Sequence, residues 1–166
     1  HISTHGVLNK YQPLHSYLLM HDTEEDDGHL TVDEIFALNL NSNLVTLSAC
    51  ETGLGELSEG DDLVGLSRAF VYAGSPSVVV SLWKVDDLVT TWLMARFYQY
   101  LGMGDAPGLS LAKAQRDLVN RRLQTPRGAA ATDIDASVGR QVKDRIDKIS
   151  RQPYYWAPFI LLGSGG

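Results

Sequence analysis

The chain contains one cysteine, Cys50, and a histidine that precedes it by 45 residues, His5. Each follows a short run of residues that is typical of a β-strand, and each lies close to a glycine. A cysteine thiol is a nucleophile only as the thiolate, and a neighbouring imidazole can accept its proton and later protonate a leaving amine. The pair could therefore cleave an acyl bond, provided that the fold brings the two residues together. A lone cysteine after an apolar run is also typical of a small buried side chain, and this alternative stays open.

Length and composition favour one globular domain with a sizeable core: the chain has 166 residues, 44% hydrophobic and 20% charged. The net charge of −6 argues against nucleic acid as a partner, because nucleic-acid binding relies on clustered Lys and Arg. A single cysteine suits a reducing compartment, and no apolar run approaches the ~18–20 residues of a membrane span, so we expect a cytoplasmic protein. The spacing of His and Cys predicts no zinc site and no phosphate loop is present, so we expect no metal and no cofactor.

Alternating strand and helix patterns predict an α/β fold. Strands are expected near residues 1–5, 17–20, 44–49, 78–83 and 159–162. Helices are expected from the capping box of Thr31 and Glu34 to Leu38, before a stop at Gly74, and near residues 86–101, 109–123 and 134–149. Because strands alternate with helices, we expect a mainly parallel sheet, whose strand C-termini form the usual ligand site. His5 and Cys50 both fall at such ends.

Two further segments are interpreted from their charge and apolar pattern. The acidic stretch from Asp22 to Gly28 is interpreted as a solvated turn, since its spacing does not match a calcium-binding loop of the EF-hand type. The segment at residues 127–152 carries a narrow apolar stripe on an otherwise charged helix. This helix would either cover the domain or dock a partner.

Several motifs in a fixed order make the chain resemble one family. They are His1-Ile2-Ser3-Thr4-His5-Gly6, Leu30-Thr31-Val32-Asp33-Glu34-Ile35, Leu47-Ser48-Ala49-Cys50-Glu51-Thr52-Gly53, Gly65-Leu66-Ser67-Arg68-Ala69-Phe70, Ala73-Gly74, Ser81-Leu82-Trp83-Lys84-Val85-Asp86-Asp87 and Pro153-Tyr154-Tyr155-Trp156-Ala157-Pro158-Phe159. A histidine about 50 residues before the cysteine block is the order seen in caspases. On these motifs the chain resembles the CHAT family, caspase-like domains associated with tetratricopeptide repeats, within the caspase, separase and gingipain group of cysteine peptidases.

The resemblance implies a caspase-like three-layer sandwich with a mostly parallel sheet. The family's domain begins before its His-Gly motif, so we expect residues 1–166 to be one CHAT domain that lacks its N-terminal part, the C-terminal portion of a longer protein. Residues 127–152 exceed the family's usual length and are interpreted as an inserted helical segment. The resemblance also implies a tetratricopeptide-repeat or other regulatory region as a partner within the full-length protein.

The resemblance further implies a mechanism and a substrate class. His5 would be the general base and acid, Cys50 the nucleophile, and a polypeptide the substrate. The backbone N–H groups of Gly6 and Cys50 would form the oxyanion hole, and loss of one such donor typically costs about 100–1,000-fold in rate.

The substrate pocket is predicted from a second stretch, in which Asp86 and Asp87 follow a strand that ends near Trp83. Separase-like relatives carry a similar Leu-Trp-x-Val-x-Asp segment and cut after arginine. A carboxylate in the pocket would favour Arg or Lys, but Asp86 or Asp87 could instead cap the following helix. Trp83 would be a wall of the pocket or part of the core, and alternative wall residues are Glu51, Asp61 and Asp62.

Two functions from different classes follow. The first is a cysteine endopeptidase of the caspase and separase type, for which we expect cleavage after a basic residue. The second is a catalytically silent caspase-like module for interaction or regulation, which would allow a homodimer through an exposed sheet edge or apolar face.

Overall fold

A computed structural model describes residues 1–48, 50–51, 61–83, 86–120, 144–146, 148–149 and 152–164, and of residues 50–51 and 61–64 it describes only the backbone. The contacts divide the chain into two compact units. We call residues 1–84 with 160–164 the first unit, and residues 85–159 the second unit. Among the described residues, no helix is long and apolar enough to cross a bilayer.

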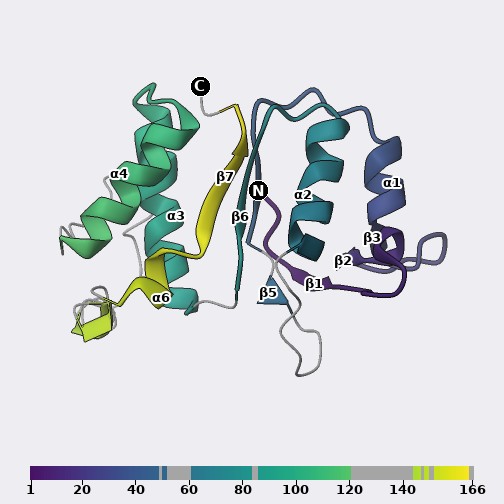
Figure 1. Ribbon diagram of the computed structural model, residues 1–166, viewed down its shortest axis with the longest axis horizontal. Coiled ribbons are helices and arrows are strands. Elements are labelled where there is room, and N and C mark those ends of the chain that lie inside the picture. The colour runs from purple at the N-terminus through teal and green to yellow at the C-terminus, as the bar shows by residue number, and fades with distance from the viewer. Residues whose placement is uncertain are drawn as a thin grey trace. The chain divides into compact units, whose positions relative to one another are not determined.

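Within the described residues, the first unit contains the strands, apart from Phe159 of β7, and the α-helices α1 and α2 (Figure 1). In chain order its elements are β1 (His5–Val7), the 3-10 helix η1 (Pro13–His15), β2 (Tyr17–Leu19), β3 (His29–Thr31), α1 (Val32–Ala37), β4 (Val45–Leu47), β5 (Cys50–Glu51), α2 (Asp61–Tyr72), β6 (Ser77–Ser81) and β7 (Phe159–Gly163). The strands predicted near residues 17–20, 44–49, 78–83 and 159–162 are confirmed. The strand expected near residues 1–5 lies further along the chain, as β1, which begins at His5. The sequence reasoning missed β3, β5, η1 and the short helix α6 (Pro153–Trp156).

One sheet contains β4, β6 and β7 in that order. β4 and β6 run parallel, with Leu47 opposite Val80. Ile2 extends the sheet by a parallel bridge to Leu47: its amide donates to the Thr46 carbonyl at 2.8 Å, and the Ser48 amide donates to the Ile2 carbonyl at 2.9 Å. All five residues of β6 are buried, as expected for a β-branched strand that is covered on both faces. This sheet positions the chain directly before Cys50.

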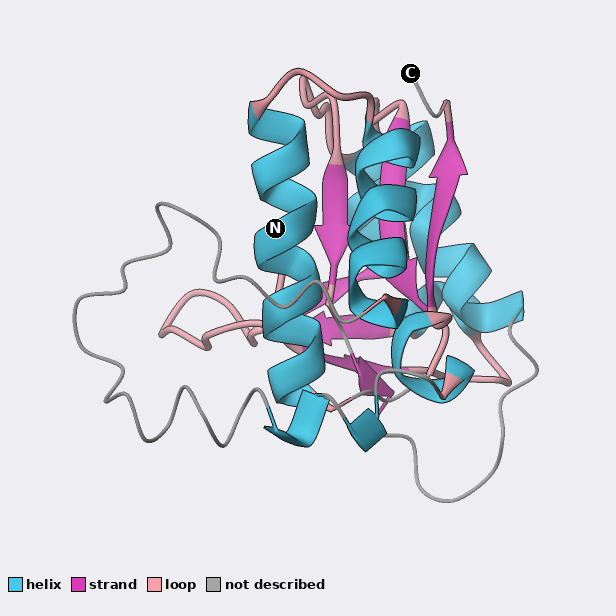
Figure 2. Cartoon of the chain, turned by 90° about the vertical axis from the view of Figure 1, so that its left-hand side faces the viewer, coloured by secondary structure: helices cyan, strands magenta, loops and turns pink. Residues whose placement is uncertain are grey.

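The remaining strands form a second sheet in the order β3-β2-β1-β5. In Figure 2 its short strands lie crosswise to the longer strands of the first sheet. β1 runs parallel to β5, but β1 with β2 and β2 with β3 are antiparallel. This corrects the expectation of one mainly parallel sheet. The connections at residues 8–16 and 20–28 are shorter than the crossover of roughly a dozen or more residues that parallel pairing requires, so the chain turns back on itself.

Helices α1 and α2 contact each other and contribute to one apolar core in the first unit. The core cluster joins residues of both helices to strands of both sheets: Leu18, Val32, Ile35, Val45, Leu47, Leu66, Ala69, Phe70, Ala73, Val78 and Val80. Burial of each large apolar side chain contributes about 1.5–3 kcal/mol relative to exposure. The residues that flank the predicted dyad, Leu18 beside β1 and Leu47 before β5, are fully buried.

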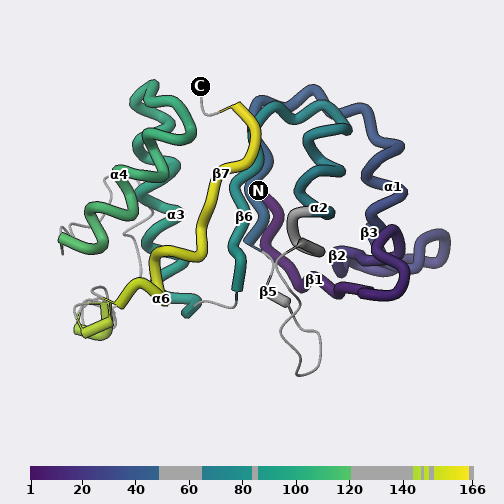
Figure 3. Tube along the Cα trace, viewed as in Figure 1, coloured from purple at the N-terminus to yellow at the C-terminus, as the bar shows by residue number. Residues whose placement is uncertain are grey.

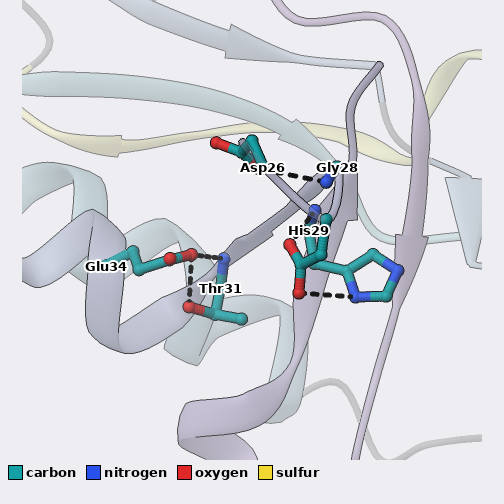
Figure 4. Close-up of polar contacts among 6 residues, drawn as sticks. Asp26, Gly28, His29, Thr31 and Glu34 are labelled. Atoms are coloured by element: carbon teal, nitrogen blue, oxygen red, sulfur yellow. Dashed lines mark hydrogen bonds and ion pairs between the residues drawn. The ribbon is translucent and has the colours of Figure 1, made fainter. Parts of the chain in front are cut away.

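The ends of α1 and α2 follow the sequence signals. Thr31 precedes α1, and its amide and hydroxyl both donate to Glu34 Oε2, at 2.8 and 2.6 Å (Figure 4). The predicted capping box is therefore confirmed. α2 ends at Tyr72, and Gly74 follows with a φ of +110°, a conformation that disfavours residues with a Cβ.

The second unit contains α3 (Asp87–Gly102), α4 (Pro107–Val119) and α6. α3 and α4 lie side by side (Figure 3), as the patterns near residues 86–101 and 109–123 predict. Asp117 of α4 is buried and accepts hydrogen bonds from Arg96 Nη2 at 2.9 Å and from the Tyr100 hydroxyl at 2.5 Å, both on α3. Gln115 Nε2 donates to the Trp156 carbonyl at 3.0 Å, which joins α4 to α6. Of the predicted helix at 134–149, residues 144–146 and 148–149 are described and are helical.

Candidate functional site: the His5–Cys50 strand pair

The backbone brings together the two residues that could do chemistry. β1 and β5 pair in parallel, with the Cα of His5 opposite that of Cys50 and Gly6 opposite Glu51 (Figure 1). Adjacent strands lie only ~4.8 Å apart. The 44 residues between His5 and Cys50 are therefore closed into a loop whose two ends are neighbours in one sheet.

Contacts on both sides hold the strand that carries His5. Thr4, the preceding residue, donates its hydroxyl hydrogen bond to the Leu19 carbonyl. At the start of the chain, His1 Nε2 lies 3.1 Å from Ser48 Oγ, two residues before Cys50. His5 itself is exposed and Gly6 is buried. The backbone around the imidazole is thus fixed by its neighbours, while the ring remains accessible to solvent.

The side chains of Cys50, Glu51, Asp61 and Asp62 lie outside the described residues. For Cys50 and Glu51 the structure gives the backbone of β5, and for Asp61 and Asp62 the backbone at the start of α2. The predicted roles of these four side chains stay predictions.

The other predicted pocket residues divide between the two units. Trp83 is half-buried in the first unit, two residues after β6. Asp86 and Asp87 belong to the second unit, where Asp87 is the exposed first residue of α3. Asp86 caps α3: its Oδ1 accepts from the amides of Leu88 at 3.1 Å and Val89 at 3.3 Å. The capping role, one of the two alternatives left open for this pair, is therefore confirmed for Asp86.

The second carboxylate oxygen of Asp86 has a partner that the sequence reasoning missed. Arg145 Nη2 lies 2.5 Å from Asp86 Oδ2. The Asp86 side chain is only 13% exposed, whereas that of Arg145 is 60% exposed. No sequence signal links these two residues, which lie 59 positions apart. The apolar stripe at residues 134–149 includes Ile146, next to Arg145, and predicts only that this stretch packs against an apolar surface.

The acidic loop makes local hydrogen bonds. Asp26 Oδ1 accepts from the Gly28 amide at 3.0 Å (Figure 4). Asp27 Oδ1 accepts from the His29 amide at 2.9 Å. These are the short-range bonds by which Asp stabilises turns. They support the interpretation as a turn, and within the described residues no group of three or more His, Cys, Asp or Glu could hold a metal ion.

Comparison with known proteins gives a family and two curated relatives. The family model of the CHAT domain matches residues 1–164. Tetratricopeptide repeat protein 28 of Mus musculus is 34% identical over 87 residues, which are 52% of this chain and 4% of the relative. Tetratricopeptide repeat protein 28 of Homo sapiens is 25% identical over 135 residues, 81% of this chain and 4% of the relative. The matched part of the chain thus spans about one twenty-fifth of the length of each relative, 4%.

Proposed function

Because the chain belongs to the CHAT family, we propose that it is a cysteine endopeptidase in which Cys50 and His5 form the catalytic dyad. The observation that carries the proposal is the register of β1 and β5, in which the backbones of His5 and Cys50 are direct neighbours. The exposure of the His5 side chain supports it further, since a general base must reach the substrate.

The proposed reaction has two half-steps. His5 takes the thiol proton of Cys50, and the thiolate attacks the carbonyl carbon of the scissile peptide bond. The tetrahedral intermediate collapses as the C–N bond breaks, and the His5 imidazolium gives its proton to the leaving amine. The acyl group then remains on Cys50 as a thioester. Water, deprotonated by His5, attacks that thioester and releases the new carboxylic acid, and the thiol is restored.

The remaining parts of the site follow from the family resemblance. The N–H groups of Gly6, in β1, and of Cys50, at the start of β5, would stabilise the oxyanion. A preference for arginine or lysine is part of the proposal, since a carboxylate in the substrate pocket would pair with a basic side chain. Glu51, Asp61 and Trp83 of the first unit stay the residues that the sequence predicts for the walls of this pocket.

The regulatory context is also part of the proposal. Both curated relatives are named as tetratricopeptide repeat proteins and are far longer than this chain. We expect the full-length protein to carry a repeat region of that kind, which would control access to the dyad. A polypeptide is the expected substrate.

Labelling of the single cysteine tests the dyad directly. A peptidyl-arginine chloromethyl ketone should alkylate Cys50 in the native chain, with incorporation followed by intact mass. His5→Ala should slow labelling by about 100-fold or more, because the thiolate loses its general base. His15→Ala removes an exposed imidazole elsewhere and is the matched control.

The outcomes separate the two functions. Labelling that is fast in the native chain and in His15→Ala, but slow in His5→Ala, supports the peptidase. If the native chain and His5→Ala label at one rate, that of free cysteine, the dyad does not form. The catalytically silent interaction module then becomes the better description.

A further inference from the structure

A hollow of about 420 Å³ lies on the first unit, between α2 and the end of β7. Its volume falls in the range of ligand-binding sites, roughly 300–1,000 Å³. The residues that line it come from two segments far apart along the chain and all belong to the first unit: Arg68, Val71, Tyr72, Leu162 and Gly163. The hollow is therefore a feature of one compact body.

The wall from α2 is the side of the helix that does not enter the core. Arg68, Val71 and Tyr72 are spaced i, i+3 and i+4, so they share one face of the helix. Val71 is 38% exposed and Tyr72 is 75% exposed. The Tyr72 ring packs edge-on against that of Phe36 on α1, with ring centroids 5.3 Å apart. This aromatic side chain is thus held at the surface and leaves most of its area open.

The opposite wall is the end of β7, the edge strand of its sheet. Ile160 and Leu162 alternate along the strand and both pack against the core cluster, yet both stay half-buried. The end of the strand is fixed, because the Ser164 amide donates to the Pro76 carbonyl at 2.8 Å. An apolar wall is therefore in place before any ligand arrives, which lowers the cost of binding.

The hollow also contains a cation whose charge is not compensated. Arg68 is the charged residue of the lining, and among the described residues no carboxylate pairs with it. By contrast, Arg96 and Arg145 each pair with an aspartate. A guanidinium binds a carboxylate through two parallel hydrogen bonds. The charge that would complement this hollow is therefore a carboxylate.

We propose that the hollow between α2 and β7 docks a segment of a partner polypeptide in which an aliphatic side chain adjoins an acidic one. The aliphatic side chain enters between Val71 and Leu162, and the carboxylate binds Arg68. Tyr and Arg are the residue types that most often dominate protein–protein interfaces. The exposed ring of Tyr72 stands beside the hollow, where a polypeptide contacts it but a small molecule that fills the hollow does not.

This inference goes beyond the proposed peptidase and needs no chemistry at Cys50. A docking site of this kind would serve an enzyme and a silent interaction module equally. Labelling of Cys50 by the peptidyl ketone and binding at the hollow are separate measurements, so either proposal can fail alone.

Peptide binding to the 166-residue chain is the first test. The probe is N-acetyl-Leu-Glu-Leu amide, and N-acetyl-Leu-Gln-Leu amide is its uncharged isostere. The backbone amide shifts of Val71, Leu162 and Gly163 report on the hollow by NMR. The glutamate probe should shift these amides and bind about 2–5-fold more tightly than the glutamine probe, the range for an exposed ion pair. Unmoved amides, or equal affinities for the two probes, would overturn the inference.

Two arginine variants identify the group that binds the carboxylate. Arg68→Gln should remove the preference for the glutamate probe and leave the affinity for the glutamine probe unchanged. Arg116→Gln removes the same charge from another exposed position, in α4 of the second unit, and should keep the native preference. If both variants lose the preference to the same extent, the effect is one of net charge and the docking site is refuted.

Two tyrosine variants test the aromatic wall. Tyr72→Ala should weaken both probes about 5-fold or more, as expected for a dominant interface residue. Tyr11→Ala removes a ring that is 84% exposed and does not line the hollow, so it should bind as the native chain does. Unchanged binding by Tyr72→Ala would contradict a polypeptide that extends beyond the hollow.

A small carboxylate distinguishes the two possible sources of the ligand. 4-Methylpentanoate carries the carboxylate and an aliphatic body without a peptide chain. It should bind more weakly than the glutamate probe, because it does not reach the Tyr72 ring. If 4-methylpentanoate binds as tightly as the peptide, the hollow is a site for a small organic acid and the polypeptide partner is wrong.

Discussion

At the scale of single residues, burial decides which polar contacts carry weight. Asp117 is 2% exposed and meets Arg96, whose side chain is 13% exposed. Asp105 and Lys113 form a second pair at 2.6 Å, but their side chains are 21% and 29% exposed. Loss of one member of a buried pair leaves an uncompensated charge, whereas a pair that keeps more contact with water contributes less.

This contrast gives a prediction about stability. Asp117→Ala should lower the free energy of unfolding by about 3–5 kcal/mol, because Arg96 and the Tyr100 hydroxyl lose a buried acceptor. Asp105→Ala should cost about 1 kcal/mol or less. Urea denaturation of the two variants measures both values, and equal losses would contradict the assignment of Asp117 as the central residue of this cluster.

At the scale of elements, local sequence signals set the ends of α1 and α2. At the end of α2, however, the need for a glycine also comes from a segment further back in the chain. Gly74, which stops α2, has a positive φ and also lies against the Leu40 carbonyl. The Leu40 amide donates to the Ala73 carbonyl at 2.6 Å, which fixes the two segments together. A Cβ at residue 74 would overlap the Leu40 carbonyl oxygen.

Gly74 and Gly104 both have a positive φ, but only at Gly74 would a Cβ collide with a neighbouring atom. Comparing them separates the cost of backbone strain from the cost of steric overlap. Gly104 has a φ of +92°, but a Cβ there meets nothing within 4 Å. Gly104→Ala should therefore cost only the backbone term, about 1–2 kcal/mol. Gly74→Ala should cost roughly 1–3 kcal/mol more, because the neighbouring backbone must also move. Thermal unfolding of both variants checks the order, and a Gly104→Ala variant that is the less stable of the two would refute it.

At the scale of the whole molecule, the two ends of the chain contribute to the same sheet. Ile2 pairs with β4, and β7 lies beside β6 although about half the chain separates β6 from β7. The Ser164 amide donates to the Pro76 carbonyl at 2.8 Å, and the Ser77 hydroxyl donates to the Ser164 carbonyl. The sheet of the first unit is therefore complete only when residues 160–164 are in place.

A truncation tests this dependence. Ending the chain at Phe159 removes the part of β7 that belongs to the first unit and keeps the carbonyl that Gln115 binds. Hydrogen exchange at the amides of Val79 and Val80 should accelerate strongly, because β6 becomes an edge strand. The amides of α4 in the second unit serve as the internal control. Unchanged protection of β6 would show that β7 contributes little to the sheet.

The sequence by itself determined most of the helices and longer strands, and it singled out the pair of residues for which we propose chemistry. Period-2 and period-3.6 patterns, the capping box of Thr31 and Glu34, and Gly74 are local signals, so they can be interpreted without knowledge of the fold. The CHAT family was likewise visible from motifs in a fixed order, and the family comparison confirms it.

Only the tertiary structure decided which distant residues meet. The antiparallel return of β1, β2 and β3 depends on the lengths of two loops, and strand direction leaves no mark on the side-chain pattern of such short strands. The register that sets His5 opposite Cys50 and the bond from Arg145 to Asp86 join residues that are far apart along the chain. Such contacts are set by the packing of whole elements against a core, and that packing is a property of the folded chain rather than of any local segment.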